Sequence, residues 1–192
     1  MPFEIVRNNL VNMEVDAVVN TANPNPVIGS GADSEVHAKA GAELLAARKK
    51  IGYIDFGAAA ITSGYELAAK YVIHTVGPIW SGGSYDEEQI LASCYRSSLA
   101  LAKNHQCESV AFPLKFPKSL ALQIAVREIS SFLIENEMQI YLVVFDKDAF
   151  ELSEKLFKSV SSYIDENYIR STMLKEYDND SLHDSSLKTR WD

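Results

Sequence analysis

The sequence predicts an α/β fold in which helices cover both faces of a central sheet. Segments with strand character and segments with helix character alternate along the chain, an order typical of a sheet packed between helices. The run Val15–Asn20 reads VDAVVN, and its apolar residues would face both sides of the sheet, as in a buried central strand. A chain of 192 residues, 47% of them hydrophobic, is long enough for one sizeable core and too short for two ordinary domains.

Strands and helices are expected in alternation along most of the chain. The strands are predicted at Phe3–Arg7, Val15–Asn20, Ala59–Thr62, Tyr71–Val76, Ser109–Pro113 and Gln139–Phe145. The helices are predicted at Ser34–Lys50, Glu87–Asn104, Lys118–Asn136 and Lys147–Tyr163. In the last helix Leu152, Leu156, Val160 and Ile164 recur every four positions, which predicts an apolar stripe buried against the sheet.

A change of composition near Asp165 predicts the end of the domain. The closing run YDNDSLHDSSLKTRWD is polar, rich in Asp and Ser, and lacks sustained periodicity. We therefore expect residues 1–168 to form the domain and residues 169–192 to form a polar acidic tail. Trp191 is a candidate anchor for that tail on the domain surface.

Charge and motif spacing exclude several classes of function. With 18 basic and 26 acidic residues the net charge is −8, so nucleic acid is not expected as a main partner. Cys94 and Cys107 lack CxxC spacing, the N-terminus lacks a secretion signal, and no apolar stretch approaches the roughly 20 residues that span a bilayer. These features predict a cytoplasmic protein. The histidines show no metal-ligand spacing, and G-x-S-x-G and G-x-G-x-x-G motifs are absent, so neither a metal nor a cofactor is expected.

The residues after the second strand predict a phosphate-sized pocket. Asn20 and Asn23 bring amide donors and acceptors to the carboxyl edge of that strand, where open α/β sheets bind ligands. The run Gly29-Ser30-Gly31-Ala32 has almost no side chains, so a ligand can approach its backbone N–H groups. Asp33 or Ser34 would cap the following helix, whose positive end then points at the same place.

This stretch resembles the macrodomain family, whose pattern runs roughly V-D-A-I-V-N-A-A-N, then a glycine-rich loop, then V-D-x-x-I-H-x-A-A-G. Here the residues are VDAVVNTAN, GSG and ADSEVHAKAG, and the similarity continues through GAAAIT, KYVIHTVGP and SVAFP, over about residues 2–168. The resemblance implies a three-layer α/β/α domain with a mixed central sheet. It also implies binding of ADP-ribose and, as in many members, removal of ADP-ribose from proteins or of acetyl from O-acetyl-ADP-ribose.

The resemblance assigns roles to individual residues. Asn23 would contact the terminal ribose and position the scissile bond or a water, and Asp33 would orient or activate that water near the anomeric carbon. These two residues form the candidate catalytic pair. The remaining ligand contacts would come from Asn9, Leu10, Asn20, Ala22, Gly29, Ser30, Gly31, Ala32 and Phe145.

Structural alternatives stay open for several of these residues. Asn20 and Asn23 belong to a residue type that commonly closes turns, and Asp33 to one that caps helices. The Gly-Ser-Gly run has the composition of an ordinary tight turn. His37 lies one turn into its helix, where packing is a commoner duty than general-base catalysis. Aromatic residues that end a strand, such as Phe145, usually belong to the core.

Two departures from the family pattern bear on activity. The adenine-end motif G-D-I-T corresponds here to Asn8-Asn9-Leu10-Val11, so the acceptor for the adenine amine is a neutral amide, which weakens that hydrogen bond by about 1 kcal/mol. The second phosphate loop, I-S-T-G-x-Y-G-Y-P in the family, is replaced by the short run Pro113-Leu114-Lys115-Phe116-Pro117. Lys115 is either a point charge for phosphate or, more in keeping with its residue type, an exposed lysine on a short connection.

Three functions compete at this stage. The first is an ADP-ribose-binding hydrolase that acts on ADP-ribosylated protein or O-acetyl-ADP-ribose. The second is a degenerate module that binds the nucleotide weakly without turnover, and the third is a protein-interaction domain whose acidic tail contacts a partner. For the hydrolase, the sequence predicts that Asp33→Ala strongly lowers turnover of a mono-ADP-ribosylated substrate and leaves the melting temperature nearly unchanged.

Overall fold

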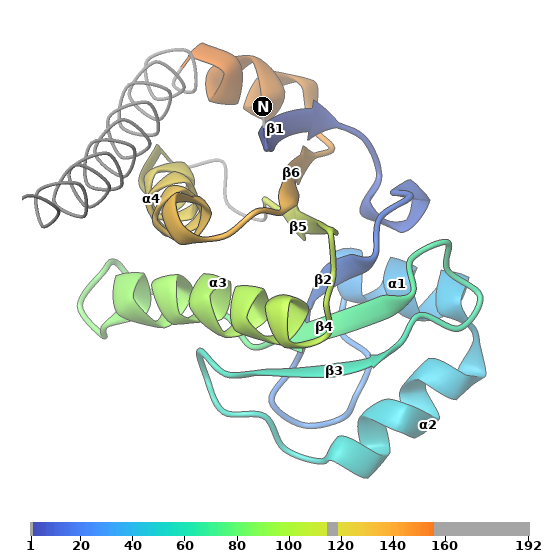
Figure 1. Cartoon of the computed structure of the whole chain (residues 1–192). Coiled ribbons are helices and arrows are strands. Elements are labelled where there is room, and N and C mark those ends of the chain that lie inside the picture. Colours follow the sequence, from blue (N-terminus) through green and yellow to red (C-terminus); the bar gives the residue numbers. More distant parts are fainter. Residues whose placement is uncertain (1, 115–118, 156–192) are drawn as a thin grey trace, which may run out of the picture. The chain divides into compact units, whose positions relative to one another are not determined.

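The computed structural model describes residues 2–114 and 119–155. Its sheet has six strands in the order β1-β6-β5-β2-β4-β3 (Figure 1). The elements are β1 (Phe3–Arg7), a 3₁₀ turn (Leu10–Asn12), β2 (Ala17–Thr21), α1 (Ala32–Ala40), α2 (Ala42–Ile51), β3 (Ala59–Ser63), β4 (Tyr71–Thr75), α3 (Glu87–Asn104), β5 (Ser109–Pro113), α4 (Ser119–Glu135) and β6 (Gln139–Val144).

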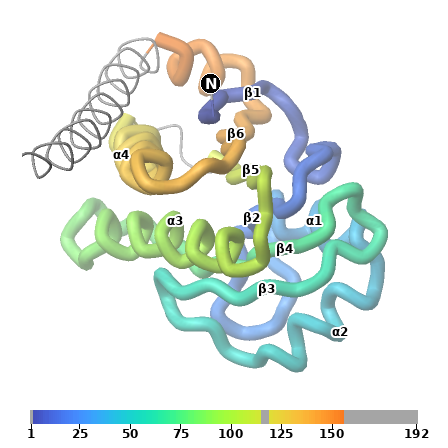
Figure 2. Tube along the Cα trace, in the orientation of Figure 1, coloured from blue at the N-terminus to red at the C-terminus, as the bar shows by residue number. Residues whose placement is uncertain are grey.

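The sheet contains both parallel and antiparallel strand pairs, and its four central strands are β6, β5, β2 and β4. Every strand pair is parallel except β3 with β4, which is antiparallel. The trace shows why: β3 turns back directly into β4, whereas helices connect most of the parallel strands (Figure 2). The carboxyl ends of β4, β2 and β5 therefore lie side by side at one edge, which is where α/β sheets bind ligands.

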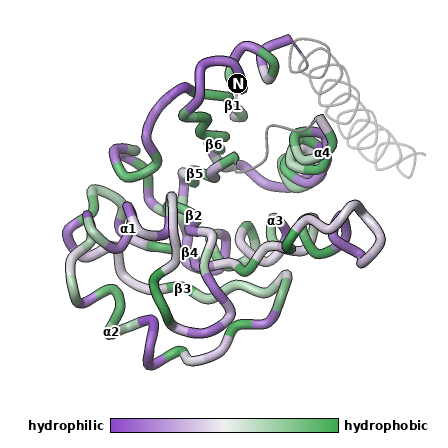
Figure 3. The backbone as a smooth tube through the Cα atoms, turned by 180° about the vertical axis from the view of Figure 1, so that it is seen from behind, coloured by the Kyte–Doolittle hydropathy of each residue, from purple (hydrophilic) through white to green (hydrophobic). Residues whose placement is uncertain are grey.

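Side chains that alternate along each strand supply two apolar layers. Val18, Val72 and Ala111 share one face and pack with Val36 of α1 and Leu44 of α2. The opposite face meets α3 and α4, and there the Phe112 ring lies 5.0 Å from the Tyr95 ring of α3. Figure 3 colours β6 and much of α4 as hydrophobic, and Ile140 and Leu142 of β6 and Ile129 of α4 are fully buried.

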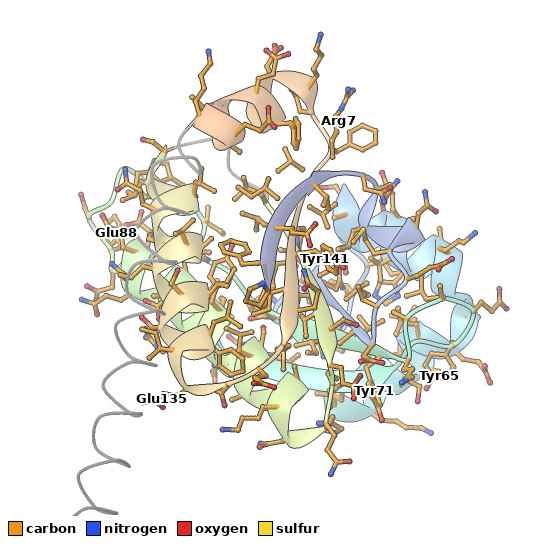
Figure 4. The ribbon with its side chains drawn as sticks, turned by 45° about the horizontal axis from the view of Figure 1, so that its top comes forward. Arg7, Tyr65, Tyr71, Glu88, Glu135 and Tyr141 are labelled. Atoms are coloured by element: carbon orange, nitrogen blue, oxygen red, sulfur yellow. The ribbon has the colours of Figure 1, made fainter. Side chains whose placement is uncertain are left out.

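Many charged side chains lie around the outside of this unit. Arg7, Glu88 and Glu135 lie at the periphery of the drawing, while Tyr141 projects from β6 over the sheet (Figure 4). Among the described residues, no helix has the length and apolar character needed to cross a membrane.

The predicted architecture is confirmed, with one helix divided in two. The single helix expected over Ser34–Lys50 is instead α1 and α2, because Gly41 between them has φ 87°, a value that interrupts a helix. The expected N-caps were also wrong, since α1 begins at Ala32 with Gly31 (φ 65°) before it. The 3₁₀ turn after β1 was not expected, and Asn9 caps it by accepting a hydrogen bond from Val11 N–H.

The last predicted helix is only partly described. Residues 147–155 are helical, in agreement with the expected start, but Leu152 is 44% exposed and so is not the buried stripe residue that we predicted. The buried residue of that segment is the neighbouring Ser153. The remainder of the predicted stripe, Lys115, Pro117, the predicted domain end at residue 168, the tail and Trp191 lie outside the described residues.

The turn between β3 and β4 requires glycine at position 64, which gives a test of the fold. A Cβ at Gly64 would lie 1.9 Å from the backbone oxygen of Ala69, so Gly64→Ala must displace backbone. We expect a loss of about 2 kcal/mol in the free energy of unfolding, or roughly 5 °C in melting temperature. The control is Gly77→Ala, because a Cβ there meets no atom within 4 Å. Equal melting temperatures for the two variants would contradict this account of the turn.

Candidate functional site

A cavity of about 280 Å³ opens above the carboxyl ends of the central strands. Its walls come from the segment after β2, the segment after β4, the ends of β5 and α4, and one side of α3. The lining residues in the described structure are Thr21–Pro24, Phe56, Val76–Ile79, Leu91, Tyr95, Pro113, Leu114 and Ala121. Of the two predicted catalytic residues, Asn23 lines this cavity and Asp33 does not.

Asp33, the second predicted catalytic residue, lies close to Asn23, and Gly29 packs against both side chains. Asp33 Oδ2 accepts a hydrogen bond of 2.5 Å from Gly29 N–H. A Cβ at Gly29 would lie 2.9 Å from Asn23 Nδ2 and 3.3 Å from Asp33 Oδ2, so only glycine fits between them without displacing a side chain. The loop glycine and the two candidate catalytic side chains therefore form one compact group.

Asn20 lies behind this group, inside β2. It is fully buried, and its Nδ2 donates a hydrogen bond of 2.6 Å to Asp33 Oδ1. The sequence placed Asn20 among the ligand contacts, but its surroundings are those of a residue that holds the Asp33 carboxylate in place. The Asp33 carboxylate is itself only 2% exposed and joins β2, the loop and α1.

A histidine on the neighbouring strand completes this hydrogen-bonded group. Asn20 Nδ2 lies 3.3 Å from His74 Nδ1, and His74 Nε2 lies 3.0 Å from Thr62 Oγ1. Since an amide Nδ2 can only donate, His74 Nδ1 accepts and its proton is on Nε2, facing Thr62. Burial, together with the charges of Arg48 and His37, lowers the pKa of His74 to about 3, so the ring is neutral near pH 7.

His37 has the packed environment that its position in the helix suggested. It is 7% exposed, its Nε2 lies 3.6 Å from Asp33 Oδ1, and its ring centroid lies 6.2 Å from that of His74. Burial lowers the pKa of His37 more than the Asp33 carboxylate raises it. In the described structure His37 Nδ1 has no hydrogen-bond partner. A neutral, buried ring fits a structural role better than that of a proton acceptor for bound substrate.

Arg48 is a buried cation beneath the Asn23 segment that sequence reasoning missed. Its Nη2 donates 3.0 Å hydrogen bonds to the backbone oxygens of Asn23 and Pro24, and its Nη1 donates to that of Gly52. It is 2% exposed, and burial lowers its pKa. In the run ARKK it resembles the exposed basic residues that usually end a helix, so nothing in the pattern distinguished it.

The other predicted ligand residues fall into two places. Ser30 and Gly31 are exposed and Ala32 is half-buried, at the amino end of α1, where free helical N–H groups favour an anion. Ala22 lines the cavity.

Asn9, Leu10 and Phe145 lie at the ends of β1 and β6. Asn9 Nδ2 donates to Glu35 Oε2 at 2.9 Å, and Leu10 is 5% exposed, in the core. Phe145 is 77% exposed, so its alternative reading as a core residue was wrong.

Arg48 should be sensitive to a substitution that preserves its charge. Arg48→Lys keeps a cation but cannot reach three carbonyl groups with one ammonium, which leaves buried carbonyls unpaired. We expect a loss of about 2 kcal/mol in the free energy of unfolding by urea denaturation. Arg127→Lys is the matched control, because Arg127 is 60% exposed in its ion pair with Glu128 and such pairs contribute little. Equal losses would contradict the role of Arg48.

The low pKa of His74 predicts a pH dependence of stability. Below about pH 6.5 the unfolded chain binds a proton that the folded protein does not take up until about pH 3. Protonation of His74 therefore does not affect the free energy of unfolding above about pH 6.5. As the pH decreases below 6.5, that free energy decreases by up to about 1.4 kcal/mol per pH unit. Urea unfolding at pH 7, 6 and 5 measures this slope, and His74→Gln should flatten it. Parallel pH profiles for the two proteins would show that His74 does not titrate in this way.

Comparisons with known proteins identify relatives of this chain. Residues 19–115 match the family model described as Macro domain. A Macro domain-containing protein of Methanosarcina mazei is 42% identical over 82% of this chain and 89% of its own length. An O-acetyl-ADP-ribose deacetylase of Cronobacter turicensis is 41% identical over 80% and 94%. A variant of the Oceanobacillus iheyensis macrodomain with ADPR superimposes with a TM-score of 0.79 at 32% identity, over 83% of this chain and 94% of that one.

Proposed function

This chain belongs to the macrodomain family, and we propose that it binds ADP-ribose at the carboxyl edge of β2 and hydrolyses a bond at the terminal ribose. The substrate is an ADP-ribosylated protein or O-acetyl-ADP-ribose. The names of relatives support this proposal, since one is an O-acetyl-ADP-ribose deacetylase and another has a structure with ADPR.

One observation carries the proposal: the packing of Asn23, Gly29 and Asp33 into a single group beside the cavity. Asn23 is half-buried and uses one Nδ2 hydrogen, at 3.3 Å, to contact Val27 O. Its other amide hydrogen and its Oδ1 are free to bind ribose hydroxyl groups. The side chain is therefore held in place and still has hydrogen-bonding capacity directed to a ligand.

Asp33 supplies the acceptor for a water molecule. Each carboxylate oxygen accepts more than one hydrogen bond, so Oδ2 can hold a water while it accepts Gly29 N–H. The hydrogen bond that Asn20 Nδ2 donates to the other oxygen, Oδ1, fixes the carboxylate's orientation. A water held there is oriented toward the ribose that Asn23 binds, which is positioning of the kind that lowers the barrier to hydrolysis.

The first loop provides a site for the diphosphate. Gly29 and Gly31 have no side chain and Ser30 has a small one, so a ligand can approach their backbone, and α1 begins immediately after them at Ala32. The partial positive charge at the helix amino end favours a phosphate there. This assignment uses the residues named from the sequence and requires no side-chain cation.

The contacts proposed for adenine are weaker than those that an aspartate in place of Asn9 would make. Asn9 Oδ1 accepts a hydrogen bond from Val11 N–H at 3.2 Å and has one remaining lone pair for the adenine amine. The Glu35 carboxylate lies 2.9 Å from Asn9 Nδ2 and restores a negative charge beside the position where the family has aspartate. The exposed Phe145 ring is available to pack against a base at this end.

A second candidate function is nucleotide binding without turnover. The observation that favours it is the short connection from β5 to α4, in which only Leu114 and residues 115–118 separate Pro113 from Ser119. The family pattern described above has a second phosphate loop in that place. A site that lacks the residues of that loop is more open to water, which weakens electrostatic contacts with the transition state. A cytoplasmic location and an ADP-ribosylated protein as partner remain predictions of this proposal.

Asn23 is the better residue for a test of the proposal, because a substitution of the buried Asp33 would affect stability as well as turnover. Asp33→Ala would leave buried donors unpaired and lower the melting temperature as well as turnover, contrary to the expectation from sequence. Asn23→Ala removes a half-buried side chain with one long hydrogen bond. We expect it to lower kcat on a mono-ADP-ribosylated protein by about 100-fold, with a small change in melting temperature.

The matched control is Asn25→Ala, an exposed asparagine in the same segment. Calorimetric titration with ADP-ribose, and with AMP for comparison, should accompany the assay. Equal turnover in Asn23→Ala and Asn25→Ala would refute the catalytic role. Binding of ADP-ribose without product over long incubation would favour the second candidate function, and no binding would refute both.

A further inference from the structure

The loop that connects β4 with α3, residues 76–86, carries one wall of the cavity at the candidate site. Three of its residues line that cavity: Gly77, Pro78 and Ile79. Residues 81–86 are exposed, and in the described structure residues 81–85 make no backbone–backbone hydrogen bond. Asp86 has φ 57°, a conformation that residues other than glycine rarely adopt. Since it costs conformational entropy to hold such a segment in one position, some other interaction must fix it.

A buried carboxylate in the first turn of α3 supplies that interaction. Glu87 is only 3% exposed, and its Oε1 accepts hydrogen bonds from Ser81 N–H at 2.7 Å and Gly83 N–H at 3.3 Å. Its Oε2 accepts a third from Tyr85 N–H at 2.9 Å. The N–H groups of Tyr85 and Ser81 hold the pKa of Glu87 below its usual range, so the side chain is charged near pH 7. Hydrogen bonds to a charged acceptor are stronger than those to a neutral one.

Packing behind the wall leaves space, so it does not fix the loop by itself. A second cavity, of about 30 Å³, is lined by Pro78, by Trp80 and by Glu87 itself. Pro78 lines the larger cavity as well, so it separates the two. Because side chains do not fill the space behind Pro78, the position of the wall depends on the hydrogen bonds to Glu87 more than on close packing.

We propose that Glu87 is a positioning residue of the ligand site, which holds the β4–α3 loop so that Pro78 and Ile79 form the cavity wall near Asn23. This inference rests on the proposed function, because it concerns the affinity of the same site for ADP-ribose. Glu87 is not among the residues that line the larger cavity, so it acts through the loop rather than on the ligand. A loop that is already in place spares the ligand the cost of ordering it.

Glu87→Gln tests this role with almost no change in volume. The amide oxygen still accepts a hydrogen bond, but the amide nitrogen is a donor and now opposes a backbone N–H. Glu88→Gln is the matched control, because it removes the same charge from the next residue, which is exposed at the periphery (Figure 4). Glu87→Asp, which keeps the charge on a shorter side chain, is the second variant should the first fold poorly. Melting temperatures establish that each variant is folded.

Hydrogen exchange and ligand affinity are the two measurements. We expect amide exchange in residues 81–85 to be about tenfold faster in Glu87→Gln than in the parent protein. The dissociation constant for ADP-ribose, from calorimetric titration, should rise about fivefold, as it does when a loop occupies its binding position for about a fifth of the time. In turnover assays the loss should appear in KM with kcat nearly unchanged, since the wall contacts the ligand before and during the reaction. Glu88→Gln should match the parent protein.

The outcomes separate this inference from the proposed function. If the parent protein binds ADP-ribose and a folded Glu87→Gln or Glu87→Asp variant binds it as tightly, the inference is wrong and the proposed function stands. Unchanged exchange of the loop in a folded variant also overturns the inference, because Glu87 then does not hold the loop. Equal losses in Glu88→Gln would assign the effect to the charge at the helix end and overturn it as well. If the parent protein does not bind ADP-ribose, the proposed function fails and this inference fails with it.

Discussion

The site depends on one buried carboxylate. Asp33 accepts hydrogen bonds from Asn20 in β2 and from Gly29 N–H in the loop, while it belongs to the first turn of α1. A buried charge is tolerated only when such partners are present, so the same bonds that stabilise Asp33 also fix the strand, the loop and the helix relative to one another. The close approach at Gly29 follows from this arrangement, because it lets Asn23 reach the same point.

No cationic side chain among the described residues forms a direct ion pair with Asp33 near neutral pH. Both nearby histidines have lowered pKa values through burial, so neither adds a positive charge near neutral pH. The cation of this region, Arg48, is directed to the backbone carbonyls of Asn23, Pro24 and Gly52 rather than to the carboxylate. Asp33 therefore keeps hydrogen-bonding capacity for a water, whereas a direct ion pair with Arg48 would have used it. The same cation fixes the backbone that carries Asn23.

The sequence predicted the fold better than the site. The ranges of β1, α3 and β5 agree with those in the structure because long apolar periodicity and buried strands leave a clear local pattern. Asn23, Asp33 and the glycine loop were named from the strand-loop-helix pattern and from the resemblance to a known family, and the structure brings them close together, while their roles stay predictions. Arg48 and His74 were missed as parts of the site, since their partners are distant in sequence and come together only through the pairing of β2 with β4 and the packing of α2. The division of one helix at Gly41 depends on a backbone angle that residue type alone does not determine.

Asn23 lies between the glycine loop and the cavity, and these two surfaces differ in the kind of contact that they can make with a ligand. On the loop side, a helix amino end and backbone N–H groups recognise charge, and these contacts are directional. On the cavity side, apolar walls recognise volume, and burial there is non-directional. A ligand that met both sides would therefore be held by directional contacts to charge on one side of Asn23 and by burial of apolar surface on the other.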